Sequence, residues 1–139
     1  MDKLYPSQKC GKVLMQSEQS PIQISLTPRF KKDLRELAKR YRSIRSDMQQ
    51  LIEQLQAGET PGDRIAGVKY QVFKVRLKNS DIQKGKSGGY RVIYYLKTEQ
   101  EIILTTIYSK SDLSDVGNEV IEEAIAKYEQ AMPIKENPK

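Results

Sequence analysis

The chain has 139 residues, of which 37% are apolar and 30% are charged, and it carries a formal net charge of +6. This length predicts one domain with a modest core, and the basic surplus favours a polyanionic partner such as nucleic acid. The single cysteine, Cys10, excludes an intrachain disulfide and fits a reducing cytosol.

The two ends of the chain are polar and show no periodicity, so residues 1–20 and 132–139 are expected to be flexible tails. The first of them lacks the apolar centre of a signal peptide, and no stretch is apolar enough for a membrane helix, so we expect a cytoplasmic protein. From Ile22 to Leu26 apolar and polar residues alternate, as in a half-buried strand. Thr27-Pro28 then predicts a helix start, with threonine as the N-cap.

Two helices are expected next, because apolar residues recur at intervals of three and four over residues 28–42 and again over 44–57. The short break between them predicts an antiparallel hairpin of helices. Glycine, threonine and proline in the segment 58–62 end the second helix.

Three strands and a last helix follow the hairpin. Apolar and cationic side chains alternate within residues 69–78, while 90–97 and 101–108 are rich in Val, Ile, Thr and Tyr and are separated by a short break. The last helix is expected over 115–130. We therefore predict one α+β domain over 21–131, a small antiparallel sheet with an N-terminal two-helix hairpin and a C-terminal helix.

Positive charge is concentrated in residues 64–97. This region has nine Lys or Arg residues and one acid, Asp81, so that nine minus one gives +8, more than the net charge of the whole chain. Lys74, Arg76 and Lys78 alternate along one predicted strand and therefore face the same side. A solvated sheet face is the alternative interpretation, but so uneven a ratio favours a phosphate-binding surface.

The loop after this strand adds Lys84 and Lys86 beside three glycines, which let a backbone approach a phosphate closely. Tyr90, Tyr94 and Tyr95 are available to stack on bases or to form hydrogen bonds. Because Tyr94 and Tyr95 face opposite sides of a strand, we expect at least one of them in the core.

The residue types restrict the chemistry. The sequence contains no histidine, which excludes Ser-His and Cys-His catalysis and leaves no residues typical of a zinc site. One acid in the basic region argues against a paired-carboxylate or magnesium-dependent hydrolase. Cations alone suffice for RNA cleavage, because a lysine among like charges can deprotonate the 2′-OH while an arginine holds the phosphate. Periodicity does not distinguish this catalysis from simple binding.

Residues 64–116 resemble the core of RelE-type toxins, above all their HigB-like branch. A basic strand precedes a lysine–glycine loop, then the sequence GGYRVIYY, then a strand ending in IYSKS. The resemblance extends over about 22–130. It implies a RelE-like fold and a toxin of a type II toxin-antitoxin system that cleaves mRNA on the ribosome without metal or cofactor. It also implies a cognate antitoxin that blocks the site.

The resemblance implies roles for individual residues. Lys74 and Arg76 take the places of two strand lysines proposed as general base and charge stabiliser, and Arg91 that of the phosphate-binding arginine. Ser111 and Gly117 stand where RelE proper has an arginine and a tyrosine, which leaves the proton donor unassigned. The candidate catalytic residues are therefore Lys74, Arg76 and Arg91, and the candidate RNA-binding residues are Lys78, Lys84, Lys86, Lys110 and Tyr94.

Lys86, Tyr94 and Tyr108 are the candidates to replace the missing proton donor. Three other functions stay open: a ParE-like toxin that poisons DNA gyrase, a non-catalytic nucleic-acid-binding module, and a structural protein with a solvated basic face. The cationic strand set and the long lysine loop favour the ribonuclease, and the sequence leaves the oligomeric state undetermined.

Overall fold

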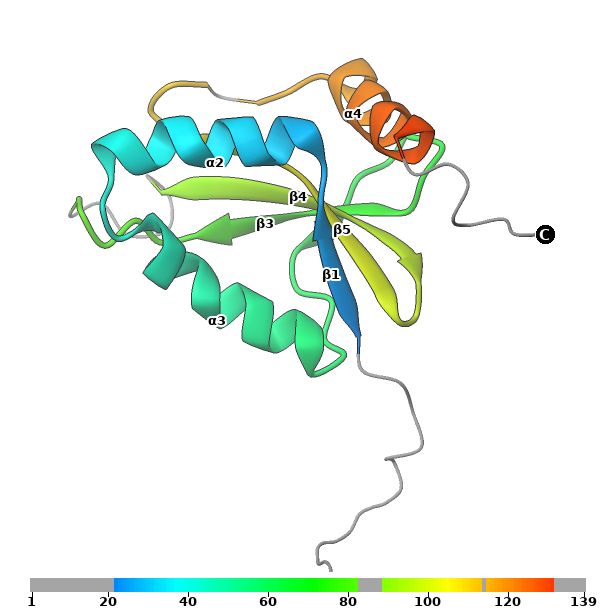
Figure 1. Ribbon diagram of the computed structural model, residues 1–139, viewed down its shortest axis with the longest axis horizontal. Coiled ribbons are helices and arrows are strands. Elements are labelled where there is room, and N and C mark those ends of the chain that lie inside the picture. The colour runs from blue at the N-terminus through cyan, green and yellow to red at the C-terminus, as the bar shows by residue number, and fades with distance from the viewer. Residues whose placement is uncertain (1–21, 83–88, 114, 132–139) are drawn as a thin grey trace, which may run out of the picture.

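The computed structural model describes residues 22–82, 89–113 and 115–131, which form a five-stranded sheet and three helices (Figure 1). The strands are β1 (Gln23–Leu26), β2 (Asp63–Arg64), β3 (Val72–Leu77), β4 (Tyr90–Thr98) and β5 (Glu101–Ser109). The helices are α2 (Pro28–Arg40), α3 (Ile44–Gln56) and α4 (Asn118–Gln130). This arrangement confirms the predicted α+β class, with a helical pair before most of the sheet and one helix after it.

The sheet has the strand order β1-β5-β4-β3-β2 and is mixed rather than wholly antiparallel. Four strands pair antiparallel, but β1 pairs parallel with β5, and Ile24 lies opposite Ile102. The expected antiparallel pairing holds for strands joined by short connections. β1 is joined to the rest of the sheet through α2 and α3, and a connection that contains helices allows parallel pairing.

The start of α2 matches the prediction from Thr27-Pro28. The Thr27 hydroxyl accepts a hydrogen bond from the Phe30 backbone N–H at 3.0 Å and donates one to the Thr105 carbonyl at 2.7 Å. The same side chain therefore caps the helix and attaches it to β5. α2 ends at Arg40, two residues earlier than expected, because Tyr41 is extended.

The N-terminus of α3 is capped from outside the helix. Asp81, in the turn after β3, accepts hydrogen bonds from the Ser43 N–H at 2.9 Å and from its hydroxyl at 3.2 Å. In return, the Ser80 N–H donates to the Asp47 carboxylate at 3.0 Å. A carboxylate at a helix N-terminus is stabilising, and here it attaches the end of β3 to the helix.

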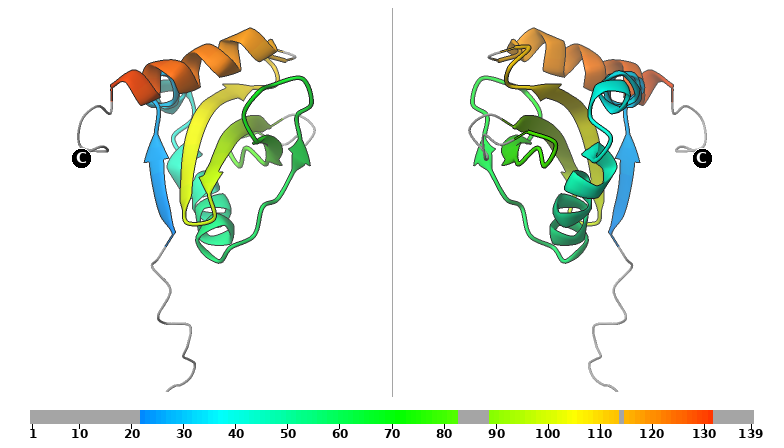
Figure 2. Two further views of the ribbon diagram at one scale, coloured as in Figure 1. Left: turned by 90° about the vertical axis from the view of Figure 1, so that its right-hand side faces the viewer. Right: turned by 90° about the vertical axis from the view of Figure 1, so that its left-hand side faces the viewer.

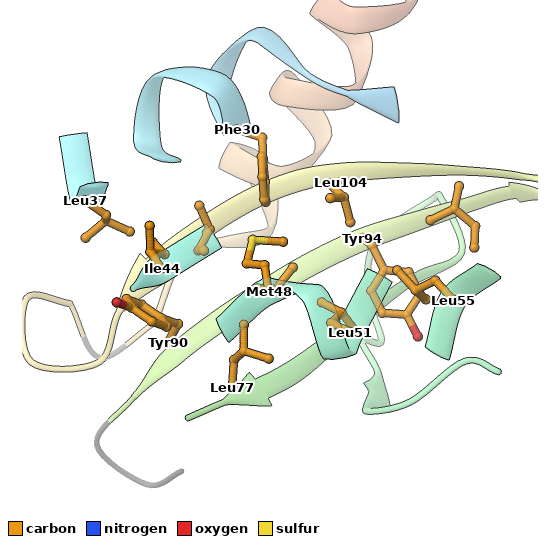
Figure 3. Packing of buried hydrophobic residues seen from close by; sticks show 13 residues of the cluster. Phe30, Leu37, Ile44, Met48, Leu51, Leu55, Leu77, Tyr90, Tyr94 and Leu104 are labelled. Atoms are coloured by element: carbon orange, nitrogen blue, oxygen red, sulfur yellow. The ribbon is translucent and has the colours of Figure 1, made fainter. Parts of the chain in front are cut away.

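The main core lies between the sheet and the helices α2 and α3 (Figure 3). The buried residues of α3 recur at helical spacing, as the sequence predicts, and pack with apolar side chains of β4 and β5. The fully or nearly buried residues of this layer include Phe30, Leu37, Ile44, Met48, Leu51, Leu55, Tyr90, Val92, Tyr94 and Leu104.

The opposite face of the sheet has a smaller core. α4 crosses one end of the sheet (Figure 2). There Ile121 and Ile125 pack on Val72, Ile93 and Tyr108. The helix begins at Asn118 rather than at residue 115, because its N-cap, Gly117, is extended. The small extent of this core leaves part of the face open for other uses.

Buried tyrosines make the fold sensitive to alkali. Burial raises the pKa of Tyr90 and Tyr94 well above its usual value, and raises that of Tyr108 to about 12. A raised folded-state pKa gives stability that is complete below the unfolded value of 10.0 and is lost as the pH rises through the folded value. We expect the melting temperature to fall as the pH rises above about 10, and tyrosinate absorbance to appear in the same pH range.

Tyr94→Phe is the matched control for this alkaline transition. It removes one ionising group and one hydrogen bond to the backbone. The variant should be less stable at neutral pH, yet its melting temperature should depend less on alkaline pH. Tyrosinate absorbance that rises fully without loss of the folded state would contradict the expectation.

Candidate nucleic-acid interface

Three of the predicted site residues, Lys74, Arg76 and Arg91, lie on the sheet face opposite the main core. In the antiparallel register Arg76 of β3 lies opposite Arg91 of β4, and Arg91 lies opposite Tyr108 of β5. Residues paired in this way point to the same face. Lys74 is two residues before Arg76 on the same face. Two arginines opposite each other on neighbouring strands repel, so this pair lowers the stability of the fold. A role in function would explain why both residues are present.

A groove of about 640 Å³ collects most of the predicted cations. It follows β3 and is bounded by side chains of α3 and by the segment that leads into β2. Among the described residues it contains one acid, Asp63, and its cationic lining residues are Lys74, Arg76, Lys78, Arg91 and Lys110. The fold thus brings together five of the eight candidate residues from three separate segments.

Gly62 lets the groove wall approach the sheet. Its φ is +95°, and a Cβ atom at this position would collide with the backbone carbonyl of Lys74. Only a residue without a side chain places the chain so close to β3. The close approach places Asp63 of β2 opposite Lys74 of β3.

Arg91 is the most buried cation of the groove, with 7% of its surface exposed. Its Nη1 donates to the Tyr90 carbonyl at 3.3 Å, and its positive charge acts to lower the pKa of Tyr108. The Asp81 carboxylate accepts its hydrogen bonds at the N-terminus of α3. A buried guanidinium held at the base of a cationic groove has the rigid fork that binds phosphate oxygens.

The structure adds one residue to the site, Asp115, which sequence reasoning had not placed there. Asp115, between β5 and α4, accepts hydrogen bonds from Lys74 Nζ at 3.1 Å and from the Tyr108 hydroxyl at 3.3 Å. The bond from Lys74 lowers the pKa of Asp115. In the sequence Asp115 reads as part of an acidic helix 41 residues from its partner, and no local pattern links it to Lys74.

Tyr94 does not belong to the interface. Its side chain is fully buried in the main core, stacks on Phe73 with ring centroids 5.4 Å apart, and donates its hydroxyl to the Pro61 carbonyl at 2.6 Å. The expectation that it binds RNA is therefore corrected. Of the tyrosine pair, Tyr94 packs in the main core and Tyr95 packs beside the smaller one, because the two point to opposite faces.

Of the remaining residues that the sequence analysis singled out, Lys110 lies in the groove and Ser111 and Gly117 have structural contacts. The Lys110 side chain lines the groove, and its backbone N–H donates to the Gly89 carbonyl at 2.9 Å. Ser111 pairs with the Ser109 hydroxyl at 2.9 Å, and Gly117 is the N-cap of α4. Lys84 and Lys86 lie outside the described residues.

A small five-stranded mixed sheet with a helical pair on one face and a third helix on the other is consistent with the fold of the RelE/ParE toxin superfamily. The model of one of its families, described as the ParE toxin of the type II toxin-antitoxin system, parDE, matches residues 24–113, and the chain belongs to this family. The matched segment extends from β1 through α2, α3 and the rest of the sheet. No curated protein sequence matches the chain.

Family membership makes the chain a toxin of a type II toxin-antitoxin system and implies a cognate antitoxin as its partner. In the described part of the chain, no helix has the length and apolar character needed to cross a membrane.

Proposed function

We propose that this toxin cleaves messenger RNA on the ribosome without a metal ion, as a member of the HigB-like branch. The observation that carries the proposal is the cationic groove, in which five Lys or Arg side chains meet one acid. A surface of this composition suits an RNA backbone, since each phosphate carries a full negative charge.

Each cation has a place in the proposed reaction. Arg91 and Arg76 lie opposite each other and bind the oxygens of the scissile phosphate, because guanidinium groups hold phosphate in a fork. Lys74, once released from Asp115, removes the proton of the attacking 2′-OH. Lys78 and Lys110 bind the backbone on either side of the cleaved bond, and Lys84 and Lys86, which follow β3 in the sequence, add to this contact.

The antitoxin is proposed to cover this groove. A bound protein that presents acidic side chains neutralises the five cations and blocks access of RNA at once. Co-expression of the antitoxin should therefore suppress both growth arrest and RNA cleavage.

Induction of the toxin in growing cells, followed by primer extension on abundant messages, tests the ribonuclease function. We expect slowed growth and new 5′ ends within translated regions, which disappear when translation initiation is blocked. An Arg76→Ala and Lys78→Ala double variant should accumulate to the same level without producing these ends. Growth arrest with intact messages would overturn the proposal.

Gyrase poisoning is the second candidate, and it is favoured by the family model, whose description names the ParE toxin. A toxin of this kind needs no ribonuclease site, and its basic groove would serve another contact. The same induced cells distinguish the two functions, because a gyrase poison leaves messages intact but relaxes plasmid DNA and inhibits supercoiling by purified gyrase. Binding of RNA with neither activity would instead indicate a non-catalytic module.

A further inference from the structure

Three hydrogen bonds converge on one oxygen atom beside the groove. Asp115 Oδ1 accepts from Lys74 Nζ at 3.1 Å, from the Tyr108 hydroxyl at 3.3 Å and from the Val116 N–H at 2.9 Å. The backbone bond fixes the carboxylate on its own segment, while the two side-chain bonds join β3 to β5. The Asp115 carboxylate therefore binds the Lys74 amine and the Tyr108 hydroxyl through the same oxygen atom.

Tyr108 presents an acidic proton at the margin of the cationic site. Its ring is buried with Ile93, Ile121 and Ile125, which fixes the direction of the side chain. Its hydroxyl reaches a carboxylate whose side chain is 62% exposed, and its backbone lies directly opposite Arg91. The proton thus lies beside an exposed carboxylate and on the same sheet face as the proposed phosphate-binding arginine.

Tyr94 and Tyr108 are both buried tyrosines, but their hydroxyl groups donate to different kinds of acceptor. Tyr94 donates to the Pro61 carbonyl, a neutral backbone acceptor beside the core. Tyr108 donates to an ionised carboxylate that water could solvate fully and that also binds Lys74. A link to an exposed charged group is unnecessary for burial, so the stability of the core alone does not account for it.

We propose that Tyr108 is the proton donor to the leaving group and that Asp115 is the residue that positions its hydroxyl. The inference rests on the proposed ribonuclease function and supplies the role that Ser111 and Gly117 leave unassigned. At neutral pH the phenol is protonated, because burial and the Asp115 charge raise its pKa to about 12. It remains a stronger acid than the alcohol that leaves the phosphate.

The reaction balances with residues of this chain and water. Lys74 is the base in its neutral form, after its ammonium has left Asp115 and given one proton to water. The 2′-oxygen bonds to phosphorus and its proton passes to this neutral amine, while the bond from phosphorus to the 5′-oxygen breaks. The Tyr108 proton passes to that 5′-oxygen, which gives a 2′,3′-cyclic phosphate and a 5′-hydroxyl end. Water then returns a proton to the tyrosinate and accepts one from the lysine.

A substrate with a sulfur leaving group tests this assignment. The linkage cleaved in the primer-extension experiment is placed in a ribosome-bound message with its 5′-bridging oxygen replaced by sulfur, because a thiolate leaves without a proton. Tyr108→Phe should slow cleavage of the oxygen substrate by about 100-fold, within the range for loss of a general acid. On the sulfur substrate, the variant and the parent should cleave at rates within about threefold of each other.

Two further variants complete the test. Tyr128→Phe removes a hydroxyl from another buried tyrosine, in α4, and should cleave both substrates like the parent. Asp115→Asn keeps an oxygen in place but weakens the acceptor, so it should lower kcat on the oxygen substrate without raising KM. Its loss should again be smaller on the sulfur substrate, which a purely structural role would not produce.

The outcomes are distinguishable. Equal slowing of Tyr108→Phe on both substrates would assign the residue a structural role, and unchanged cleavage of both would remove it from the site; either result overturns the inference while leaving the ribonuclease intact. A parent protein that cleaves neither substrate would overturn the proposed function and this inference together.

Discussion

Replacing Arg91 with alanine is expected to lower the rate of RNA cleavage by about two orders of magnitude, because loss of one preorganised charge donor removes roughly 3 kcal/mol of transition-state stabilisation. Arg91 is buried at the base of the groove between Arg76 and Tyr108, where water does not replace its charge. Single-turnover cleavage of a ribosome-bound message measures this effect directly.

The same substitution also shortens a buried side chain, so the melting temperature is expected to fall by several degrees. Rates are therefore compared per folded molecule, at a temperature well below both midpoints. Arg91→Lys keeps the charge but loses the fork and should recover only part of the rate. Lys97→Ala is the matched control, because Lys97 lies near the other end of β4 and faces Glu129 at 3.8 Å. A destabilised Arg91→Ala protein with full activity per folded molecule would refute the assignment.

RNA binding is expected to weaken by about 100-fold between about 50 and 200 mM salt. The estimate follows from the groove, since five cations that each neutralise one phosphate of single-stranded RNA give a log–log slope of roughly −0.7 × 5, or about −3.5. Titration of a labelled single-stranded RNA at several salt concentrations gives the slope. A slow variant such as Tyr108→Phe, which is expected to cleave about 100-fold more slowly, limits RNA cleavage during the measurement.

Variants that remove one positive charge test whether the groove residues cause this salt dependence. Lys78→Gln, in the groove, should make it shallower by about 0.7 and weaken binding at every salt concentration. Lys39→Gln, in the last turn of α2 and outside the groove, should leave it unchanged. An affinity that does not respond to salt would mean that the groove does not bind a polyanion.

Local sequence was sufficient to predict the helices and all the strands except β2, including the basic strand. Thr27-Pro28 marks the start of α2 because capping depends on neighbours in sequence, and the buried residues of α3 recur at helical spacing. The alternation around Arg76 correctly separates the cationic face of β3 from its apolar face. The two-residue strand β2 gave no signal, since no periodicity is visible in so short a segment.

The sequence by itself determined every helix and strand except β2, the α+β class and the cluster of cations, because helix and strand periods and charge are properties of nearby residues. Only the tertiary structure decided that β1 pairs parallel with β5, that Tyr94 is buried, and that Asp81 caps α3. It alone brought Asp115 to Lys74 and Tyr108, because β3, β5 and the segment before α4 meet only when the sheet forms. Contacts between distant segments depend on register and packing, which no local pattern encodes.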